Sequence, residues 1–298
     1  GNLYMPEKLT GKQARVLIEA LEADGFSVEK RAPKERARTS VLRELAKPGQ
    51  TIKIGVCSDM HLGSKYQQLT YLRDFYKYAD ARGVSAFINA GDIVDGPVGF
   101  HRDHVYGNFR HGFDAQVLYA ASVYPKSDNG PTYFVGGNHD RGFVNAAGAT
   151  VGEWLSKSRP DLVNLGEQSA DLDIGSARIF VSHGARGGLS YARSYRIQKL
   201  LEQMEPKQRD QTDVAIYGHW HVAAHLPGYQ SVEAFLVPCF QMQTPFLRSL
   251  GLQPVIGGLV LEIEFGAKGV WNIRTDWRLY SEPMRGDYPG AELDGEKQ

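Results

Sequence analysis

Cysteine and long apolar runs are both scarce in this sequence. Only two of its 298 residues are cysteine, Cys57 and Cys239, and they form no CxxC pair. The chain therefore has no disulfide framework, and we expect both thiols to fill the core of a protein in a reducing, cytoplasmic location. No apolar run approaches the roughly 20 residues of a membrane helix. The N-terminal stretch GNLYMPEKLTG lacks the layout of a signal peptide, so we expect no role at a membrane.

An excess of charge of either sign is also absent. Lysine and arginine together number 34, and so do aspartate and glutamate. A surface for nucleic acid must therefore be local. The remaining composition, with 42% hydrophobic and 23% charged residues, is that of a soluble globular protein. The length fits one large domain, alone or with a small appendage.

Residues 1–50 differ in pattern from the rest and predict a small helical unit. A capping-box sequence begins one helix over residues 10–25, and the apolar residues of 33–49 share one face of a second. The second half of this unit is basic. It therefore resembles a small helix-turn-helix that binds DNA. The alternative is an amphipathic hairpin packed against the main domain.

Residues 51–282 have the layout of an α/β (α+β) domain. Five short apolar strands are predicted first, namely TIKIGVC, VSAFINA, PTYFVGG, ARIFVSH and DVAIYGH. Amphipathic segments near 67–81, 110–123, 150–157 and 189–204 separate most of them. Three later strands have no helices between them, which favours a second, mixed or antiparallel sheet. We therefore expect two packed mixed sheets flanked by helices, followed by a loose polar tail over 283–298.

Metal-binding side chains follow each of the first five strands. Asp59 and His61 follow the first strand, and Asp92 and Asp95 follow the second. The same positions after the next three strands hold Asn138, His139 and Asp140, then His183, then His219 and His221. Because sites in α/β sheets form at the carboxyl ends of strands, we expect all of these side chains to converge at one edge.

The number of candidate ligands favours two ions. Two aspartates, one asparagine and four histidines make seven, too many for one tetrahedral zinc. They suit a pair of ions that share a bridging carboxylate, and mixed imidazole and carboxylate donors favour Mn, Fe or Zn, with Mn preferred. Such a pair clamps a phosphate and activates a bridging water as hydroxide. A histidine that is not a ligand can then protonate the leaving oxygen.

The motifs DxH, GD, GNHD, H and GHxH, in this order over residues 52–225, resemble those of the calcineurin-like metallophosphoesterase superfamily. The resemblance implies a four-layer sandwich and a role for each motif residue. It assigns the first metal to Asp59, His61 and His221. It assigns the second metal to Asn138, His183 and His219, with Asp92 as the bridge.

The resemblance also implies a catalytic group outside the ligand set. His139 is the proton donor beside the scissile phosphate, and Asp95 or Asp140 orients its imidazole. His225 lies outside the pattern, and we interpret it as structural.

Substrate contacts are predicted from residues beside the motifs. Arg141 and Arg186 each follow a motif and can pair with a phosphate oxygen. The alternative for each is an ordinary surface charge. The linker over residues 96–113 is rich in His, Arg and aromatics, a mix that can stack bases. Its histidines, His101, His104 and His111, are candidates for substrate contact. A loop that only packs over the sheet edge is the alternative for this linker.

Motif detail points toward DNA. The family's protein phosphatases have an arginine after the second Asp of GDxxD, where this chain has Gly96. The stretches SDMHLGSK and AGDIVDG resemble the exonuclease small subunit of archaeal D-family DNA polymerase and, less closely, nucleases of double-strand-break repair. We therefore predict a DNA exonuclease with a possible partner protein in replication or repair.

Two alternative functions are compatible with the sequence. A phosphoesterase or phosphatase for nucleotides, cyclic nucleotides or other small molecules would use the same metal ligands. A non-catalytic DNA-binding subunit is the least favoured reading, because every expected ligand is present.

Overall fold

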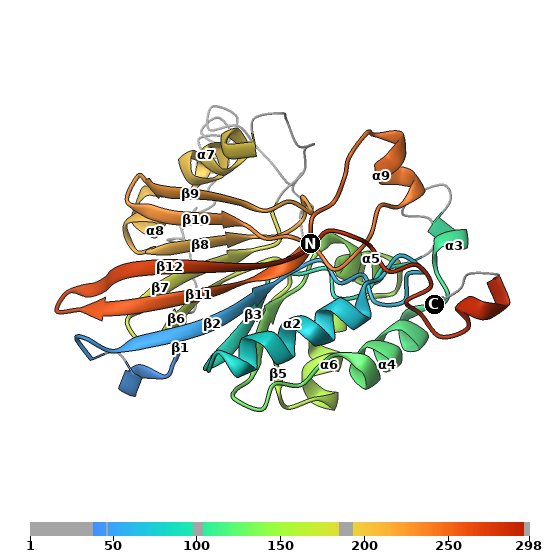
Figure 1. The fold of residues 1–298 in the computed structure, drawn as a ribbon, viewed down its shortest axis with the longest axis horizontal. Coiled ribbons are helices and arrows are strands. Elements are labelled where there is room, and N and C mark those ends of the chain that lie inside the picture. Colours follow the sequence, from blue (N-terminus) through green and yellow to red (C-terminus); the bar gives the residue numbers. More distant parts are fainter. Residues whose placement is uncertain (1–37, 46, 98–103, 185–192, 295–298) are drawn as a thin grey trace, which may run out of the picture. The chain divides into compact units, whose positions relative to one another are not determined.

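Two six-stranded sheets packed face to face form the centre of the computed structural model (Figure 1). The structure describes residues 38–294 apart from residues 46, 98–103 and 185–192. The described residues all belong to one unit of the chain, residues 37–298. The predicted helix over 10–25 and the histidine at position 101 lie outside the described residues.

The first sheet, here called sheet B, has the order β12-β11-β2-β3-β4-β5. Its strands are β2 (Thr51–Cys57), β3 (Ala86–Asn89), β4 (Thr132–Val135), β5 (Leu162–Gly166), β11 (Ile256–Gly266) and β12 (Gly269–Tyr280). Strands β2 to β5 are parallel, whereas β11 and β12 run antiparallel to their neighbours. Every residue of β3 and β4 is buried, because layers cover both faces of the sheet.

The second sheet, here called sheet A, has the order β1-β6-β7-β8-β10-β9. Its strands are β1 (Arg38–Val41), β6 (Ser169–Ile174), β7 (Ala177–Ser182), β8 (Val214–Tyr217), β9 (Ala224–Tyr229) and β10 (Val232–Leu236). Strands β7, β8 and β10 are parallel. Their carboxyl ends therefore meet at one edge of this sheet.

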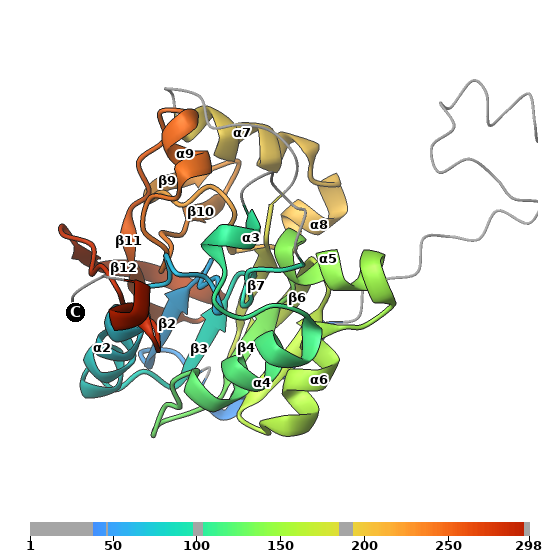
Figure 2. The same ribbon diagram turned by 90° about the vertical axis from the view of Figure 1, so that its right-hand side faces the viewer.

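Helices cover the outer face of each sheet (Figures 1 and 2). Helices α2 (Leu69–Ala81), α4 (Phe113–Val123) and α6 (Val151–Ser158) pack on sheet B, while α7 (Arg193–Gln203) packs on sheet A. The remaining described helices are α3 (His104–Gly107), α5 (Asn138–Ala147), α8 (Pro206–Asp210), α9 (Pro245–Ser249) and the 3₁₀ turns η1 (Arg43–Leu45) and η2 (Ala291–Asp294). One apolar core fills the space between the sheets, and another lies under the helices on each side.

The predicted fold class is confirmed, because two mixed sheets lie packed between helices. The division of strands between the sheets differs from the expectation. The C-terminal strands do not form a sheet of their own, since β11 pairs with β2 and β10 pairs with β8. Strands β5, β6 and β9 are not among the predicted strands. Each interrupts its apolar residues with polar residues, glycine or proline and is only partly buried, so none forms a continuous apolar run.

The predicted helix over residues 33–49 is wrong for its described part. Residues Arg38–Val41 form the edge strand β1, which pairs in parallel with β6. Leu42 then has a φ of 52°, which a right-handed helix does not allow. Pairing with β6, reinforced by the 3.1 Å ion pair between Arg38 Nε and Asp173 Oδ1, overrides the local helical pattern.

The segment after β12 is not a loose tail where it is described. Tyr288 is buried and stacks on Phe109. The Asp287 carboxylate accepts hydrogen bonds from the backbone N of Thr70 at 2.8 Å and from its hydroxyl at 2.7 Å. It thereby serves the first turn of α2, where Gln68 provides no side-chain cap. This cap comes from a residue more than 200 positions away, so local sequence does not reveal it.

Truncation tests where the sandwich begins. A protein that lacks residues 1–36 but keeps β1 is the reference. Removal of residues 1–48 also removes β1 and the partly buried Val41, Leu42 and Leu45, so we expect a loss of about 3 kcal/mol. Chemical denaturation of both truncated proteins measures the difference. Equal stability of the two would contradict a structural role for β1.

Candidate metal centre

The backbone is left-handed at five of the seven predicted metal ligands. Eight described residues other than glycine have a positive φ, and five of them are predicted ligands. These five are Asp59 (55°), His61 (47°), Asp92 (52°), His219 (85°) and His221 (54°). This conformation is unfavourable for residues with a Cβ and is concentrated at functional sites. Here it turns side chains from successive loops toward one point.

Six of the seven predicted ligands, with His139, form three groups whose candidate ligand atoms lie within 4.8 Å of one another. The groups are Asp59, His61 and His221; then Asp92, His183 and His219; then His61, Asp92 and His139. Aspartates 59 and 92 follow strands of sheet B, whereas His183, His219 and His221 follow strands of sheet A. Each of the first two groups therefore joins the two sheets.

In the first group, three lone-pair atoms converge. The Nε2 atoms of His61 and His221 lie 3.3 Å apart, and Asp59 Oδ1 lies 3.2 Å from the His221 nitrogen and 3.9 Å from that of His61. Asp59 Oδ1 is buried and has no hydrogen-bond partner. A buried carboxylate oxygen without a partner is costly, and a cation held among these three atoms would satisfy it. The first group therefore fits a metal ion.

The second group is completed by the amide of Asn138. Asp92 Oδ2 lies 2.9 Å from His183 Nε2. Asn138 Oδ1 lies 3.0 Å from His183 Nε2 and 2.8 Å from His219 Nδ1. Asp92 also belongs to the group with His61, so its carboxylate stands between the two sets of ligands. This donor set of oxygen and imidazole nitrogen atoms fits a second divalent ion.

Hydrogen bonds behind the ligands orient two of the imidazoles. His61 Nδ1 lies 3.0 Å from Asp95 Oδ1, and His183 Nδ1 lies 2.7 Å from the carbonyl oxygen of Ala90. Each contact places the proton on Nδ1 and directs the Nε2 lone pair into the site, as is usual for metal-binding histidines. Gln241 donates to the same oxygen of Asp95 at 3.3 Å.

Burial and mutual attraction set the charges of the site. Burial alone would raise the pKa of Asp92, but His183 and His139 outweigh it and hold that pKa well below its usual range. Burial lowers the pKa of His183, but Asp92 and Asp59 raise it to about 9. Burial lowers the pKa of His219 to about 4, with a further contribution from His183. A metal ion therefore meets an ionised carboxylate and displaces a proton from His183.

His139 lies beside the ligands at the start of α5. Its Nδ1 is 2.6 Å from the carbonyl oxygen of Asp95, and its backbone N donates to Asp92 Oδ1 at 2.8 Å. Burial lowers the pKa of its imidazole to about 4, against the opposing charge of Asp92. At neutral pH the ring is thus neutral with its proton on Nδ1.

Asp140, one of the two candidates to orient His139, bonds to the backbone of two loops. Its carboxylate accepts hydrogen bonds from the backbone N of Ile93 (3.1 Å), Val94 (3.0 Å) and Gly137 (2.9 Å). Burial, with a contribution from Asp92, raises its pKa to about 6. Asp140 therefore fastens the loop after β3 to the loop after β4. The predicted orienting role of Asp95 is filled by its backbone carbonyl.

Two glycines allow the loops to approach one another. A Cβ at Gly137 would overlap the carboxylate of Asp92, and a Cβ at Gly218 would overlap the hydroxyl of Ser58. Any other residue at either position would push a ligand-bearing loop aside. The glycines of the GNH and GHWH motifs are therefore required by close packing around the centre.

The remaining predicted residues are not all at the centre. Arg141 is exposed and donates to Gln168 Oε1 at 2.8 Å. His104 begins α3 and His111 is exposed, whereas Arg186 lies outside the described residues. His225 lies on β9, pairs with Glu233 at 2.7 Å and stacks on Phe235, which matches its structural interpretation. Both cysteines are buried and free, as predicted.

The sequence does not reveal the role of Gln241, because an isolated glutamine after a strand belongs to no motif.

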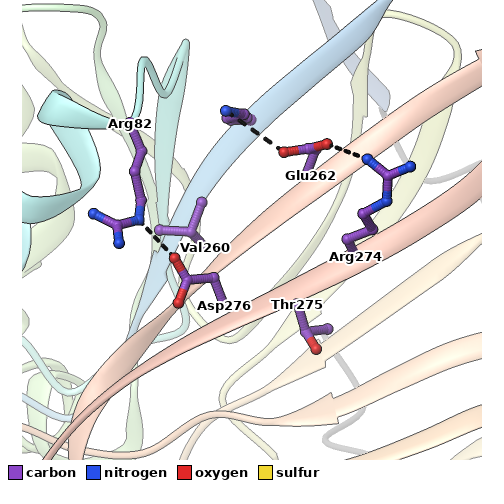
Figure 3. A pocket seen from close by; sticks show the side chains of 7 residues that line it. Arg82, Val260, Glu262, Arg274, Thr275 and Asp276 are labelled. Atoms are coloured by element: carbon purple, nitrogen blue, oxygen red, sulfur yellow. Dashed lines mark hydrogen bonds and ion pairs between the residues drawn. The ribbon is translucent and has the colours of Figure 1, made fainter.

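A cavity of about 130 Å³ lies on the outer face of sheet B (Figure 3). It is lined by Lys53, Arg82, Val260, Glu262, Arg274, Thr275 and Asp276. Its cations are already paired, since Glu262 contacts Lys53 and Arg274 while Asp276 contacts Arg82.

None of the helices among the described residues has the length and apolar character of a membrane span.

One known protein family matches this chain. The sequence profile of the calcineurin-like phosphoesterases matches residues 52–239. No curated protein matches significantly. Among solved structures, the chain is similar to one described as a novel phosphatase from Mycoplasma pneumoniae, with 12% identity and a TM-score of 0.40. That match covers 82% of this chain and 99% of the other.

Substitution of Asp92 tests whether its carboxylate serves two ions. Asp92→Asn should weaken the binding of both ions by about 100-fold, because a neutral amide replaces the shared charge. Titration calorimetry with Mn²⁺ measures both affinities. Asp95→Asn is the control, since it should weaken mainly the ion held by His61, by about 10-fold to 100-fold. Loss of only one ion in Asp92→Asn would place the bridge elsewhere.

Substitution of Asp140 tests its structural role. Asp140→Ala leaves three buried backbone N–H groups without an acceptor, so we expect the free energy of unfolding to fall by about 2–4 kcal/mol. Asp140→Asn retains one acceptor oxygen and should lose less. Denaturant unfolding at neutral pH gives both values. If Asp140→Ala were as stable as the unmodified protein, the carboxylate would not hold the two loops together.

Proposed function

Because the chain belongs to the calcineurin-like phosphoesterase family, we propose that this metal-dependent phosphoesterase is a phosphodiesterase that hydrolyses DNA. The observation that carries a hydrolytic function is the juxtaposition of two ligand groups between the sheets, in which Asp92 Oδ2 of the second group lies 3.8 Å from His61 Nε2 of the first. The two groups offer oxygen and imidazole ligands for two divalent ions.

The proposed ligand roles follow the geometry of the two groups. Asp59, His61 and His221 would hold one ion, and Asn138, His183 and His219 the other, with Asp92 shared. Mn²⁺ is the proposed ion, with Fe or Zn as alternatives, because the donors mix imidazole with oxygen. When bound, the ions would neutralise the phosphate and lower the pKa of the attacking water.

His139 is the proposed proton donor. Its hydrogen bond to the Asp95 carbonyl holds the ring in place with Nε2 unprotonated at neutral pH. Negative charge on a bound phosphate beside this atom would raise its proton affinity. The imidazole can then hold a proton and pass it to the leaving oxygen.

A DNA substrate is supported by the sequence around two motifs. The stretches SDMHLGSK and AGDIVDG resemble those of the polymerase-associated exonucleases, and Gly96 stands where the family's protein phosphatases have arginine. A partner protein from DNA replication or repair belongs to the same proposal. The alternative substrate is a small phosphoester, which the same two groups of ligands would serve equally well.

His139→Ala tests the proton donor. We expect both ions to remain bound, because the predicted ligand set does not include this residue, and the rate to fall by about 10²-fold to 10⁴-fold. Metal content and turnover are measured on the same preparation. The loss should be smaller with bis-p-nitrophenyl phosphate, whose leaving group needs little protonation. Loss of metal from the variant would show that His139 is a ligand.

A comparison of substrates tests the choice of DNA. End-labelled single-stranded and double-stranded DNA and bis-p-nitrophenyl phosphate are each incubated with the Mn²⁺-loaded protein and with His139→Ala. DNA cleavage that is lost in the variant supports the proposal and gives the polarity. Turnover of the small diester with intact DNA would favour the small-molecule alternative.

A further inference from the structure

Three chain segments form a continuous rim beside the metal centre. They are residues 63–68, 104–112 and 242–254, here called the rim segments. The first follows the candidate ligand His61 directly. Backbone hydrogen bonds join it to the other two: Lys65 N to Gly107 O at 2.7 Å, Phe109 N to Gly63 O at 3.0 Å, and Met242 N to Tyr66 O at 2.8 Å. The helices α3 and α9 belong to these segments and lie at the same end of the sandwich (Figures 1 and 2).

Both ends of the segment that carries α9 are tied to the centre. Gln241, which precedes it, donates to Asp95 Oδ1 at 3.3 Å. Val255, which follows it, donates its backbone N–H to the carbonyl oxygen of His221 at 2.8 Å. The rim therefore lies next to the candidate ligands, within reach of a substrate whose phosphate sits at the metal centre.

Exposed apolar side chains are concentrated on the rim. Nine large hydrophobic residues are exposed in the described part of the chain, and four of them are Val105, Tyr106, Phe246 and Leu250. Tyr106 is 77% exposed on α3, and Phe246 is 42% exposed on α9. Such exposure is costly in water and marks surfaces that bind a partner or ligand.

The charged side chains of the three rim segments are all basic. The three rim segments contain Lys65, Arg110 and Arg248 but no aspartate or glutamate, in a chain where acids and bases are equal in number. Arg110 is exposed and lies over the rings of Phe109 and Tyr119, at 5.4 and 5.6 Å. Asp287 contacts Gln67 through its backbone carbonyl, but its carboxylate is bonded to Thr70.

We infer that the rim binds a single strand of nucleic acid, with bases stacked on Tyr106 and Phe246 and phosphates near Arg110 and Arg248. The inference rests on the proposed function and specifies the form of its substrate. Exposed aromatics together with cations are the combination that holds single strands without regard to sequence. A duplex offers few free base faces, because its bases already stack on one another.

Aromatic substitutions test the stacking. Fluorescence anisotropy in EDTA, where no cleavage occurs, compares a labelled (dT)12 with an abasic 12-mer of equal charge. Tyr106→Ala and Phe246→Ala should each bind (dT)12 about 10-fold to 100-fold more weakly, with the abasic strand unaffected. Trp271→Ala is the matched control, because Trp271 is 76% exposed but lies on the edge strand β12. It should bind both strands like the unmodified protein.

The salt dependence of binding tests the cations. Arg248→Ala should reduce the slope of log affinity against log salt concentration by about 0.7, the value for one phosphate contact on a single strand. Turnover of bis-p-nitrophenyl phosphate should stay unchanged in all of these rim variants. An unchanged slope would remove Arg248 from the surface that binds the strand.

The outcomes separate this inference from the proposed function. If the unmodified protein cleaves DNA while the Tyr106 and Phe246 variants bind (dT)12 normally, the rim inference is overturned and the nuclease proposal stands. Equal affinity for duplex and (dT)12 would also overturn the inference. If the protein hydrolyses only the small diester and binds neither strand, the proposed DNA substrate fails, and the rim inference fails with it.

Discussion

The arrangement of the groups around the centre depends on two buried carboxylates at the junction of the sheets. Asp59 and Asp92 are almost fully buried, and both have a pKa below the usual range because imidazoles surround them. Buried charges persist only when they are paired or bind a metal. Of the histidines that compensate them, His183 and His221 come from the opposite sheet, whereas His139 follows a strand of the same sheet. The glycines and left-handed turns around the centre allow those groups to come together.

Much of this centre could be predicted from sequence, for a physical reason. Each candidate ligand lies within a few residues of the end of a buried strand, and parallel strands bring their carboxyl ends to one edge. The candidate ligands Asn138 and His219 are 81 residues apart. Their positions after β4 and β8 place each at the carboxyl edge of its own sheet, and the packing of the two sheets brings them together. The apolar strands can be predicted from the sequence because a strand that is buried on both faces consists of a continuous hydrophobic run.

Other features depend on pairings that local sequence does not encode. Strand β1 exists because the edge of β6 is available, although its own residues favour a helix. Asp140 follows His139 directly, but α5 directs its carboxylate to the backbone of the loop after β3. Only part of the rim can be predicted from the sequence. The linker over residues 96–113 stands out by its aromatic and basic residues. The segment around α9, residues 242–254, belongs to the rim only because of its backbone contacts with residues 63–68.

The division of ligands between the sheets has a consequence for the lifetime of the protein. His61 and His221 are separated by 160 residues and belong to different layers, so ions at the proposed sites would act as cross-links that clamp the layers at one end. An unfolded chain scatters these side chains and binds an ion poorly. Mass action then favours the folded chain as free metal rises. Scarcity of metal would thus open the sandwich to proteases, and the abundance of the protein would follow the supply of its ion.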